Sequence, residues 1–475
     1  MRKTTAAFYV ILTMIITATG TVFGMRYLEE RIPVLADNPQ MAGMEKIEQI
    51  YQLILDEYVE PVDGEMLIEG AIEGMLEKLD DPYSVYMNAE QSRHFKETLD
   101  SSFEGIGAEI GEEDGKIIVI APFKNSPAER AGLQPYDQII KVNGEDVTGE
   151  NIYEVSERIR GEKGTKVTLE IVREGVSQPI KLEITRDEIP IETVFSTILD
   201  YEGKSIGIVE ITSFSRQTGK DFATQLRELE EQGIEGLIID VRGNPGGLLS
   251  SVHEVAGLLI TKEKPIVQIE YRNGKREQIF SRLKKRKPYP IAVLIDRGSA
   301  SAAEILAAAL YEGEGYPTIG ETTFGKGTVQ QQIELPDQSQ VKLTTYKWLT
   351  PDGNWLHKKG LEPKIPVKQA ELFQIHPLST DEPLRRNMNN EEIKQLQNML
   401  NSLGYQTART DGYFDDSTEQ ALRRFQKEQG VPETGIYDEK TARSLADVLR
   451  YEKQKPENDR QLMMALKYFH YILSH

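Results

Sequence analysis

Two short, almost entirely apolar runs constrain the fold of this chain most. Gly236–Val241 is apolar apart from Asp240, and Ile291–Ile295 is apolar throughout. A strand of this composition has both faces buried, as in a parallel sheet covered by helices. Each run ends in a turn of small residues and continues into a helical pattern, at Leu248–Leu259 and Ala302–Leu310. The middle of the chain is therefore expected to be a layered α/β structure.

The size and charge of the chain limit the functions it can have. With 475 residues it is too long for one ordinary domain, and roughly three domains are expected. The net charge of −20 argues against nucleic-acid binding, because contact with phosphates needs clustered lysine and arginine. The absence of cysteine excludes disulfides, thiolate nucleophiles and cysteine-ligated zinc. No metal or cofactor motif stands out, so neither is expected.

The N-terminus predicts export from the cytoplasm. Arg2 and Lys3 precede a mostly apolar stretch from Ala6 to Gly24, which is typical of a signal peptide or a short membrane anchor. We favour the uncleaved anchor and leave cleavage open. The basic flank would stay in the cytoplasm and place the bulk of the protein outside. Residues 1–43 are expected to be this segment and a linker.

Residues 44–102 are expected to be a helical N-terminal segment. Apolar side chains recur there at three- and four-residue steps, first from Ile47 to Tyr58 and again from Met66 to Leu76. This apolar surface predicts dimerisation, and a homodimer is expected. Core packing within the chain is the alternative.

Residues 103–187 resemble a PDZ domain along their whole length. A glycine loop enters a strand, Ser126-Pro127 begins a short helix, and Asn143-Gly144 forms a tight turn between strands. PDZ domains bind a peptide's C-terminal carboxylate with loop amides while the peptide adds a strand to the sheet edge. The resemblance implies that the substrate's C-terminus is bound by Gly105, Ile106, Gly107 and Ala108.

Residues 388–449 form a unit with an internal echo. Gly412–Thr418 resembles Gly435–Thr441, and each copy places an aspartate suited to capping before a helix. The unit resembles the small helical peptidoglycan-binding domain of bacteria, and a packing role such as dimer formation is the alternative. Residues 371–387 are expected to be a polar linker. The tail, residues 450–475, is expected to be a helix that packs on the body or on another subunit.

The segments Asp296–Ile305 and Thr323–Gln330 carry the chemistry. A serine hydroxyl becomes a nucleophile when a base takes its proton, and no histidine of this chain lies in a motif typical of that base. A neutral lysine can serve instead, and burial favours the neutral form. Glycines on both sides of Lys326 let its backbone approach another element closely.

A phosphate-binding loop is the competing interpretation of the lysine segment. Gly320–Lys326 fits the first seven positions of that motif, but Gly327 stands where Ser or Thr should hold magnesium. No strand of a nucleotide-binding unit or magnesium-binding aspartate accompanies the loop. Nucleotide binding is therefore not expected.

Residues 44–370 resemble the carboxyl-terminal processing peptidases, also called tail-specific proteases. The resemblance implies a multidomain α/β protein with a PDZ domain and a crotonase/ClpP-like protease core at residues 188–370. It implies that Ser301, the serine between two alanines, is the nucleophile rather than Ser299. Lys326 would be the base, and Gln330 would orient it.

The mechanism implied is acyl transfer, which needs two backbone donors for the oxyanion. Ala302, at the start of a helix, is one candidate, and Gly246 or Gly247 supplies the other; the sequence does not choose between these glycines. In this family the PDZ domain gates the protease, and the resemblance assigns Arg160 to coupling the PDZ domain to the lysine and glutamine.

The order of domains is most similar to that of sporulation-signalling members in endospore-forming bacteria. Such members cut a regulator of intramembrane proteolysis, so the expected substrate is an extracytoplasmic or membrane protein. The expected activity is that of a serine endopeptidase. A non-catalytic scaffold that binds peptide tails and cell wall is the alternative.

Overall fold

The computed structural model describes residues 39–100, 102–113, 115–123, 126–173, 176, 178–375, 378 and 382–474. The predicted signal or anchor segment, Ala6 to Gly24, lies outside the described residues. Among the residues that are described, no helix is both long and apolar enough to cross a membrane. The chain divides into two compact units: one contains the described residues up to Ala89 together with Gln332–Leu343, and the other contains the rest.

The first unit is built from helices α2 (Pro39–Glu57) and α3 (Gly64–Glu77) and strand β1 (Val85–Met87). Strand β1 pairs antiparallel with the start of β18 (Gln340–Leu349). No residue of α3 is buried. Large apolar side chains of both helices are exposed, namely Met44, Ile47, Ile50, Leu53, Met66, Ile68 and Met75. Part of the apolar surface of these helices is therefore exposed on the single chain.

The second unit begins with α4 (Ala89–Asp100) and a PDZ-like sheet. The sheet order is β3 (Ala108–Glu113), β4 (Lys116–Pro122), β5 (Gln138–Val142), β7 (Lys166–Val172) and β8 (Ile180–Thr185), with β6 (Glu145–Asp146) on β5. Strand β3 lies at the edge of this sheet. A separate antiparallel pair is formed by β2 (Ser102–Gly105), which precedes the strands of this sheet in the sequence, and β9 (Asp187–Pro190), which follows them. Helices α5 (Pro127–Arg130) and α6 (Ile152–Ile159) complete it.

The local signals read from this segment are confirmed. Ser126 caps α5, because its Oγ accepts from the Glu129 N–H at 3.1 Å, and Pro127 is the first helical residue. Asn143 and Gly144 both have positive φ, 52° and 86°, and connect β5 to β6. Buried apolar side chains from the strands and from α6 form one core.

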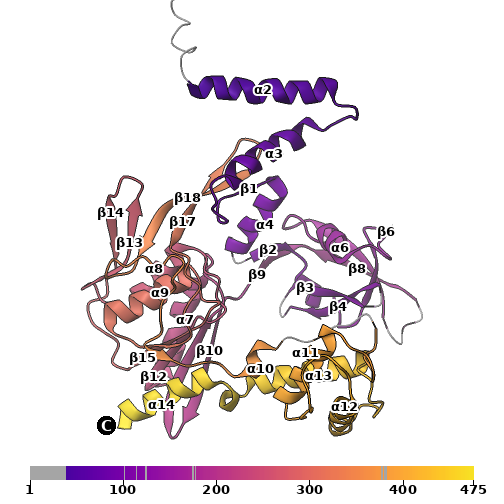
Figure 1. Ribbon diagram of the computed structural model, residues 1–475, viewed down its shortest axis with the longest axis vertical. Coiled ribbons are helices and arrows are strands. Elements are labelled where there is room, and N and C mark those ends of the chain that lie inside the picture. Colours follow the sequence, from indigo (N-terminus) through magenta and orange to yellow (C-terminus); the bar gives the residue numbers. More distant parts are fainter. Residues whose placement is uncertain are drawn as a thin grey trace, which may run out of the picture. The chain divides into compact units, whose positions relative to one another are not determined.

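The protease core is a layered sheet, as the apolar runs predict. Its order is β10 (Val194–Tyr201), β11 (Lys204–Ile211), β12 (Gly236–Asp240), β15 (Ile291–Ile295), β16 (Thr318–Gly320) and β19 (Ile365–Pro366). All neighbours are parallel except β10 and β11. Helices α7 (Thr218–Glu231), α8 (Leu249–Gly257) and α9 (Ala302–Ala308) cover one face, and α14 (Arg460–Ser474) covers the other (Figure 1).

Strand β12 shows why both faces had to be apolar. Leu237 and Ile239 belong to the core under α7, α8 and α9, whereas Ile238 belongs to the core under α14. All three side chains are fully buried. The C-terminal tail therefore packs on the body of the protein, and Phe469 at its centre is fully buried.

A second, antiparallel sheet was not predicted from the sequence. It consists of β13 (Pro265–Tyr271), β14 (Arg276–Phe280), β17 (Thr328–Glu334) and β18 together with β1. The loop with Lys326 leads directly into β17.

The C-terminal module contains α10 (Glu371–Gln374), α11 (Glu391–Ser402), α12 (Asp416–Glu428) and α13 (Glu439–Gln454), followed by the turn η2 (Pro456–Asn458). The internal echo is structural. Asp415 caps α12 by accepting from Thr418 N–H, and Asp438 caps α13 by accepting from Thr441 N–H, both at 2.9 Å.

The sequence and structure differ at the borders of this module. Helix α13 continues to Gln454, past the predicted border at residue 449. Leu372 and Leu384 are buried in the module's core, so the segment read as a polar linker, residues 371–387, contributes to packing. The apolar side chains of this stretch follow neither a helical nor a strand period, so the pattern was too weak to reveal this.

Candidate active site

The turn after β15 separates the two candidate serines by their surroundings. Ser299 is fully buried, and its hydroxyl donates to the Val241 carbonyl at 2.7 Å. Asp296 Oδ1 accepts from the N–H groups of Ser299, at 3.1 Å, and Gly243, at 2.8 Å. Ser299 and Asp296 therefore tie the turn after β15 to the turn after β12, and the Ser299 hydroxyl is committed to that task.

Ser301 occupies a different environment. It is half-buried and directly precedes α9. Its backbone angles, φ 51° and ψ −110°, lie in a region that residues other than glycine rarely adopt. Such backbone strain persists only where the surroundings enforce it, and it clusters at functional sites.

Glu304 is the residue that enforces it, and sequence reasoning missed its role. The residue is fully buried. Its Oε2 accepts from the N–H groups of Ser301 and Lys326, both at 2.8 Å. Its Oε1 accepts from the Thr323 hydroxyl at 2.6 Å and the Gly325 N–H at 2.7 Å. One carboxylate therefore holds the backbones of Ser301 and Lys326 within two hydrogen-bond lengths of one another.

A signal for Glu304 was present in the sequence. A serine followed three residues later by a glutamate, before an apolar run, is the pattern of a helix capping box. Glu304 occupies the third position of α9 and bonds back to the Ser301 N–H. The pattern predicts a helix start, but the bonds to the lysine loop depend on tertiary contact and could not be read from it.

The backbone of the lysine loop lies so close to residues 355–360 that Gly325 and Gly327 have no room for a side chain. A Cβ on Gly325 would lie 2.8 Å from the Gly360 nitrogen, and one on Gly327 would lie 2.6 Å from Trp355 Nε1. The Lys326 carbonyl accepts from Trp348 Nε1 at 2.7 Å, and the Lys326 side chain is half-buried.

The same contacts argue against a phosphate-binding loop. In such a loop the backbone N–H groups point at the ligand's phosphates. Here the N–H groups of Gly325 and Lys326 already bond to the carboxylate of Glu304. These N–H groups therefore bind the protein's own Glu304 carboxylate instead of a phosphate.

Gln330 is on β17, just after the lysine loop. Its side-chain nitrogen donates to the hydroxyls of Thr328, at 3.1 Å, and Thr344, at 3.0 Å. These two bonds fix the orientation of the amide. Its carbonyl oxygen makes no hydrogen bond among those recorded for the described residues. An orienting role for Gln330 towards Lys326 stays a prediction.

The structure distinguishes the two glycines proposed for the oxyanion. The Gly246 N–H donates to Asn244 Oδ1 at 2.8 Å and is therefore in use. A Cβ on Gly246 would lie 3.0 Å from the Ala302 nitrogen, so this turn lies against the start of α9. The N–H groups of Gly247 and Ala302 make no hydrogen bond among those recorded for the described residues. The roles of Ala302 and of either glycine as oxyanion donors stay predictions.

The predicted peptide-binding loop lies beside edge strand β3. The Ile106 carbonyl accepts from Ala128 N–H at 2.8 Å, and the Gly107 carbonyl accepts from Phe123 N–H at 2.9 Å. Gly107 has φ 74°. These bonds to the loop's carbonyls fix its backbone next to Ala108, the first residue of β3.

Arg160 follows α6. Its guanidinium lies 5.3 Å from the centre of the Phe103 ring. The structure thus records a contact of Arg160 within the PDZ region. Coupling of Arg160 to Lys326 and Gln330 stays a prediction.

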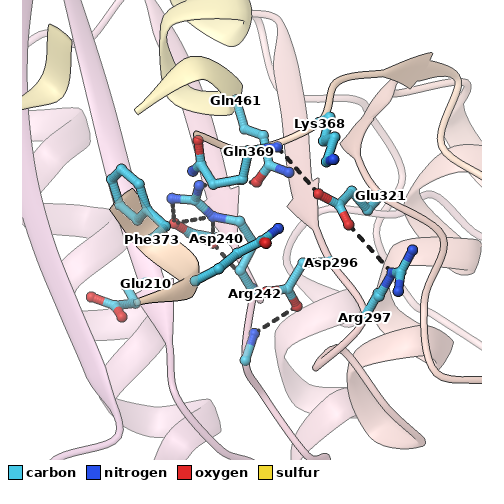
Figure 2. A pocket seen from close by; sticks show the side chains of 12 residues that line it. Glu210, Asp240, Arg242, Asp296, Arg297, Glu321, Lys368, Gln369, Phe373 and Gln461 are labelled. Carbon is cyan, nitrogen blue, oxygen red and sulfur yellow. Dashed lines mark hydrogen bonds and ion pairs between the residues drawn. The ribbon is translucent and has the colours of Figure 1, made fainter. Parts of the chain in front are cut away.

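A pocket of about 710 Å³ opens at the carboxyl ends of the parallel strands, close to the turns described above (Figure 2). Acidic residues that end or follow successive strands line the pocket. Three basic residues line it as well, namely Arg242, Arg297 and Lys368. Burial, and then the charge of Asp240, raise the pKa of Glu210 above its usual value. Among the described residues, no group of three His, Asp or Glu side chains is placed to hold a metal ion.

Comparisons with known proteins identify the parts of the chain. The family description "Peptidase family S41" matches residues 205–367, and "PDZ domain" matches residues 118–173. A peptidoglycan binding domain description matches residues 389–445. The description "Activating protease CtpB N-terminal domain" matches residues 14–91.

Whole proteins match as well. The chain is 48% identical over 463 residues to the carboxy-terminal processing protease CtpB of Bacillus subtilis, covering 96% of each chain. It is 42% identical over 463 residues to CtpA of the same organism, covering 97% of each. A solved photosystem II D1 C-terminal processing protease is 30% identical, with 67% of this chain and 86% of that one covered and a TM-score of 0.41. The chain belongs to the carboxy-terminal processing proteases of peptidase family S41, and it is a serine-type peptidase with a PDZ domain.

Proposed function

We propose that Ser301 is the nucleophile of this protease and Lys326 its general base. The observation that carries the proposal is the Glu304 carboxylate, one oxygen of which accepts from the backbone N–H groups of both residues. The other candidate, Ser299, has its hydroxyl bound to the Val241 carbonyl. Because the chain is a serine-type peptidase, the non-catalytic scaffold is not retained.

The reaction follows from these roles. Neutral Lys326 accepts the proton of the Ser301 hydroxyl as its oxygen attacks the scissile carbonyl. The N–H groups of Ala302 and Gly247 bind the oxyanion of the tetrahedral intermediate. Protonated Lys326 then donates its proton to the leaving amine as the peptide bond breaks. Water, deprotonated by Lys326, attacks the acyl-enzyme, and the Ser301 hydroxyl is restored.

Substrate selection is assigned to the PDZ domain. We propose that a substrate's C-terminal carboxylate is bound by the amides of Gly105, Ile106, Gly107 and Ala108. Strand β3 is the edge of its sheet, so a peptide can extend the sheet there, as PDZ ligands do. Arg160 would then relay substrate binding to the catalytic residues.

Removing each catalytic side chain tests the mechanism. Ser301→Ala and Lys326→Ala should each reduce peptide cleavage at least about a thousandfold with the fold retained. Lys359→Ala is the matched control, because Lys359 is an exposed lysine whose backbone N lies beside Gly325. Cleavage by Lys326→Ala at the rate of the control would overturn the lysine base.

The choice of substrate is tested with matched peptides. A peptide with a free C-terminus should be cut faster than the same peptide amidated at its C-terminus, because the amide removes the carboxylate charge. Equal rates for the two peptides would exclude carboxylate recognition by the glycine loop. For the Ser301→Ala, Lys326→Ala and Lys359→Ala variants, circular dichroism separates loss of activity from loss of fold.

We also propose that the protein works outside the cytoplasm as a homodimer. The basic and apolar N-terminal sequence supports the location, and the exposed apolar side chains of α2 and α3 support the dimer. Substituting Ile47 and Ile50 by serine should shift the dimer to monomer in analytical ultracentrifugation. An unchanged mass would remove these helices from the interface. The C-terminal module is the candidate for binding peptidoglycan, which sedimentation with purified cell wall measures.

The biological setting proposed is sporulation signalling, with an extracytoplasmic or membrane-anchored regulator as substrate. The order of domains, which resembles that of sporulation-signalling members of the family, is the ground for this choice. Incubating candidate ectodomains with the wild type and with Ser301→Ala tests it. A regulator cut by the wild type alone supports the proposal, and failure to cut any sporulation regulator contradicts it.

A further inference from the structure

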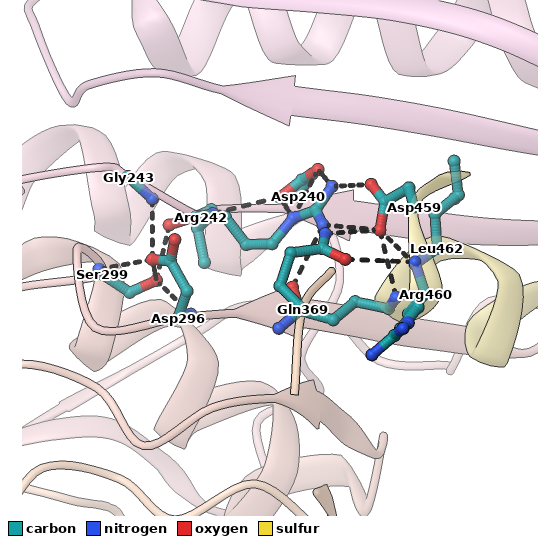
Figure 3. Close-up of polar contacts among 11 residues, drawn as sticks. Asp240, Arg242, Gly243, Asp296, Ser299, Gln369, Asp459, Arg460 and Leu462 are labelled. Atoms are coloured by element: carbon teal, nitrogen blue, oxygen red, sulfur yellow. Dashed lines mark hydrogen bonds and ion pairs between the residues drawn. The ribbon is translucent and has the colours of Figure 1, made fainter. Parts of the chain in front are cut away.

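The turn that carries Gly246 and Gly247 begins at Arg242, and Arg242 is held by the chain's C-terminal segment (Figure 3). Neither Ser301 nor Lys326 takes part in these contacts. The inference drawn from them rests on the proposed role of this turn in binding the oxyanion.

Arg242 is clamped from two sides. From its own strand end, Asp240 accepts from the Arg242 Nε at 2.9 Å and from its Nη2 at 2.6 Å. From the start of α14, Asp459 Oδ1 accepts from Nη1 at 3.0 Å and Asp459 Oδ2 lies 2.8 Å from Nη2. Gln461 Oε1 accepts a further bond from Nη1 at 3.1 Å. The side chains of Arg242 and Asp459 are only 18% and 8% exposed, so water competes little for these bonds.

The segment that enters the C-terminal module joins the same cluster. Gln369 lies before the module, and its Nε2 donates to Asp459 Oδ1 at 2.8 Å. Its Oε1 accepts from the Arg460 N–H at 3.1 Å. Its own N–H donates to Glu321 Oε1 at 3.1 Å, in the segment between β16 and the lysine loop. The two chain segments that connect the module to the protease core are therefore bonded to each other, and Gln369 reaches Arg242 through Asp459.

The backbone next to Arg242 is fixed in the same way. The Arg242 N–H donates to Asp240 Oδ1 at 3.1 Å, and the next N–H, that of Gly243, donates to Asp296. The Arg242 side chain and the Arg242 N–H thus share one anchor, the Asp240 carboxylate, and this shared anchor is the route by which a shift of the side chain would reach the first residues of the turn. Displacement of an active-site group by about 1 Å can lower a rate about a hundredfold.

We propose that Asp459, Gln461 and Gln369 are positioning residues for the oxyanion turn, acting through Arg242. The attachment of the C-terminal module to the core thereby sets the rate of turnover. A purely structural role for the cluster would lower stability and leave the turnover number of the folded enzyme unchanged.

Two variants of the full-length protein test the proposal. Asp459→Asn removes the charge that faces Arg242. Gln461→Met removes, at nearly constant volume, the acceptor for Arg242 and the Nε2 donor to the Val367 carbonyl. Arg460→Gln is the control, because the Arg460 side chain is exposed and only its backbone N–H joins the cluster. The measurements are kcat and KM on one peptide and the urea midpoint of unfolding, which gives the folded fraction.

Both variants should lower kcat about tenfold per folded enzyme, less than loss of a whole oxyanion donor, with KM within about twofold of the wild type. The control should match the wild type. Unchanged kcat in Gln461→Met would overturn the proposal, and so would a rise in KM alone. If Asp459→Asn does not fold, Gln461→Met decides. Activity that survives in Ser301→Ala would refute the proposed function instead, which separates the two failures.

Discussion

Replacing Glu304 by glutamine perturbs the centre of the site with the smallest change of shape. Glu304 is fully buried and accepts four hydrogen bonds, two at each carboxylate oxygen. Glutamine keeps one oxygen and replaces the other by an NH₂ group. With the NH₂ group at the Oε2 position, the N–H groups of Ser301 and Lys326 both face a donor. With it at the Oε1 position, the Gly325 N–H faces a donor, whereas the Thr323 hydroxyl can turn and accept.

The expected cost follows from the one or two bonds lost. A hydrogen bond to a charged group contributes about 1.5–3 kcal/mol, so the loss costs about 1.5–6 kcal/mol in the free energy of unfolding. That is a large part of the 5–15 kcal/mol typical of a domain. The repulsion also separates the Glu304 side chain from Ser301 or from Thr323 and Gly325. A displacement of about 1 Å at the nucleophile or base should lower kcat about a hundredfold.

Urea unfolding and peptide cleavage measure the two effects separately. Glu312→Gln is the matched control, since Glu312 follows α9 and accepts from the Asp352 N–H at 2.8 Å and the Asn354 side chain at 3.4 Å near the surface. It should lose no more than about 1 kcal/mol and keep its kcat. If Glu304→Gln unfolds at the urea concentration of the control and cleaves as fast, the hub role of Glu304 is refuted.

Three further predictions concern the same region. Gly247→Ala places a Cβ 2.0 Å from the Phe214 carbonyl oxygen at φ 141° and should cost about 1–3 kcal/mol or more in urea unfolding, whereas Gly257→Ala, with nothing within 4 Å, should cost nothing. Ser301→Gly should be about 1 kcal/mol more stable than Ser301→Ala, because glycine tolerates φ 51°; equal midpoints would deny the strain. Burial raises the pKa of Asp459, but the bonds and charge of Arg242 outweigh it and hold that pKa below its usual value. This stabilisation is complete above the unfolded-state pKa of about 3.9 and is lost as pH falls through the lower folded-state pKa. Stability of Asp459→Asn should therefore fall less steeply than wild type between about pH 5 and pH 2, and parallel curves would contradict this.

The parallel sheet could be predicted because its signals are local. Each strand is buried on both faces, so the run from Ile291 to Ile295 is apolar at every position. The capped helices of the C-terminal module were readable for a similar reason, since Asp415 and Asp438 each bond within their own helix start. Signals of this kind need no knowledge of the rest of the fold.

The antiparallel sheet could not be predicted, because its strands depend on partners distant in the chain. Strand β17 exposes most of its side chains, so it carries no continuous apolar pattern. Strand β18 pairs with β1 at one end and with β13 at the other, and these partners lie on either side of the PDZ region in the sequence. The border of the C-terminal module was missed for the same reason, because Leu372 and Leu384 pack on helices that follow much later.

The same division holds for the site: the identity of its residues could be predicted, but the contacts that fix their conformation could not. The spacing and the family resemblance point to Ser301 and Lys326, but neither reveals the positive φ of Ser301. That backbone is sustained by one tertiary and one local bond: the Ala300 N–H donates to the Asn244 carbonyl at 2.9 Å, and the Ser301 N–H donates to Glu304, which is itself held by the lysine loop. The strain costs about 1–3 kcal/mol and persists because these bonds over-determine the conformation of the serine. The geometry of the nucleophile is therefore a property of the assembled core, which no stretch of sequence around Ser301 contains.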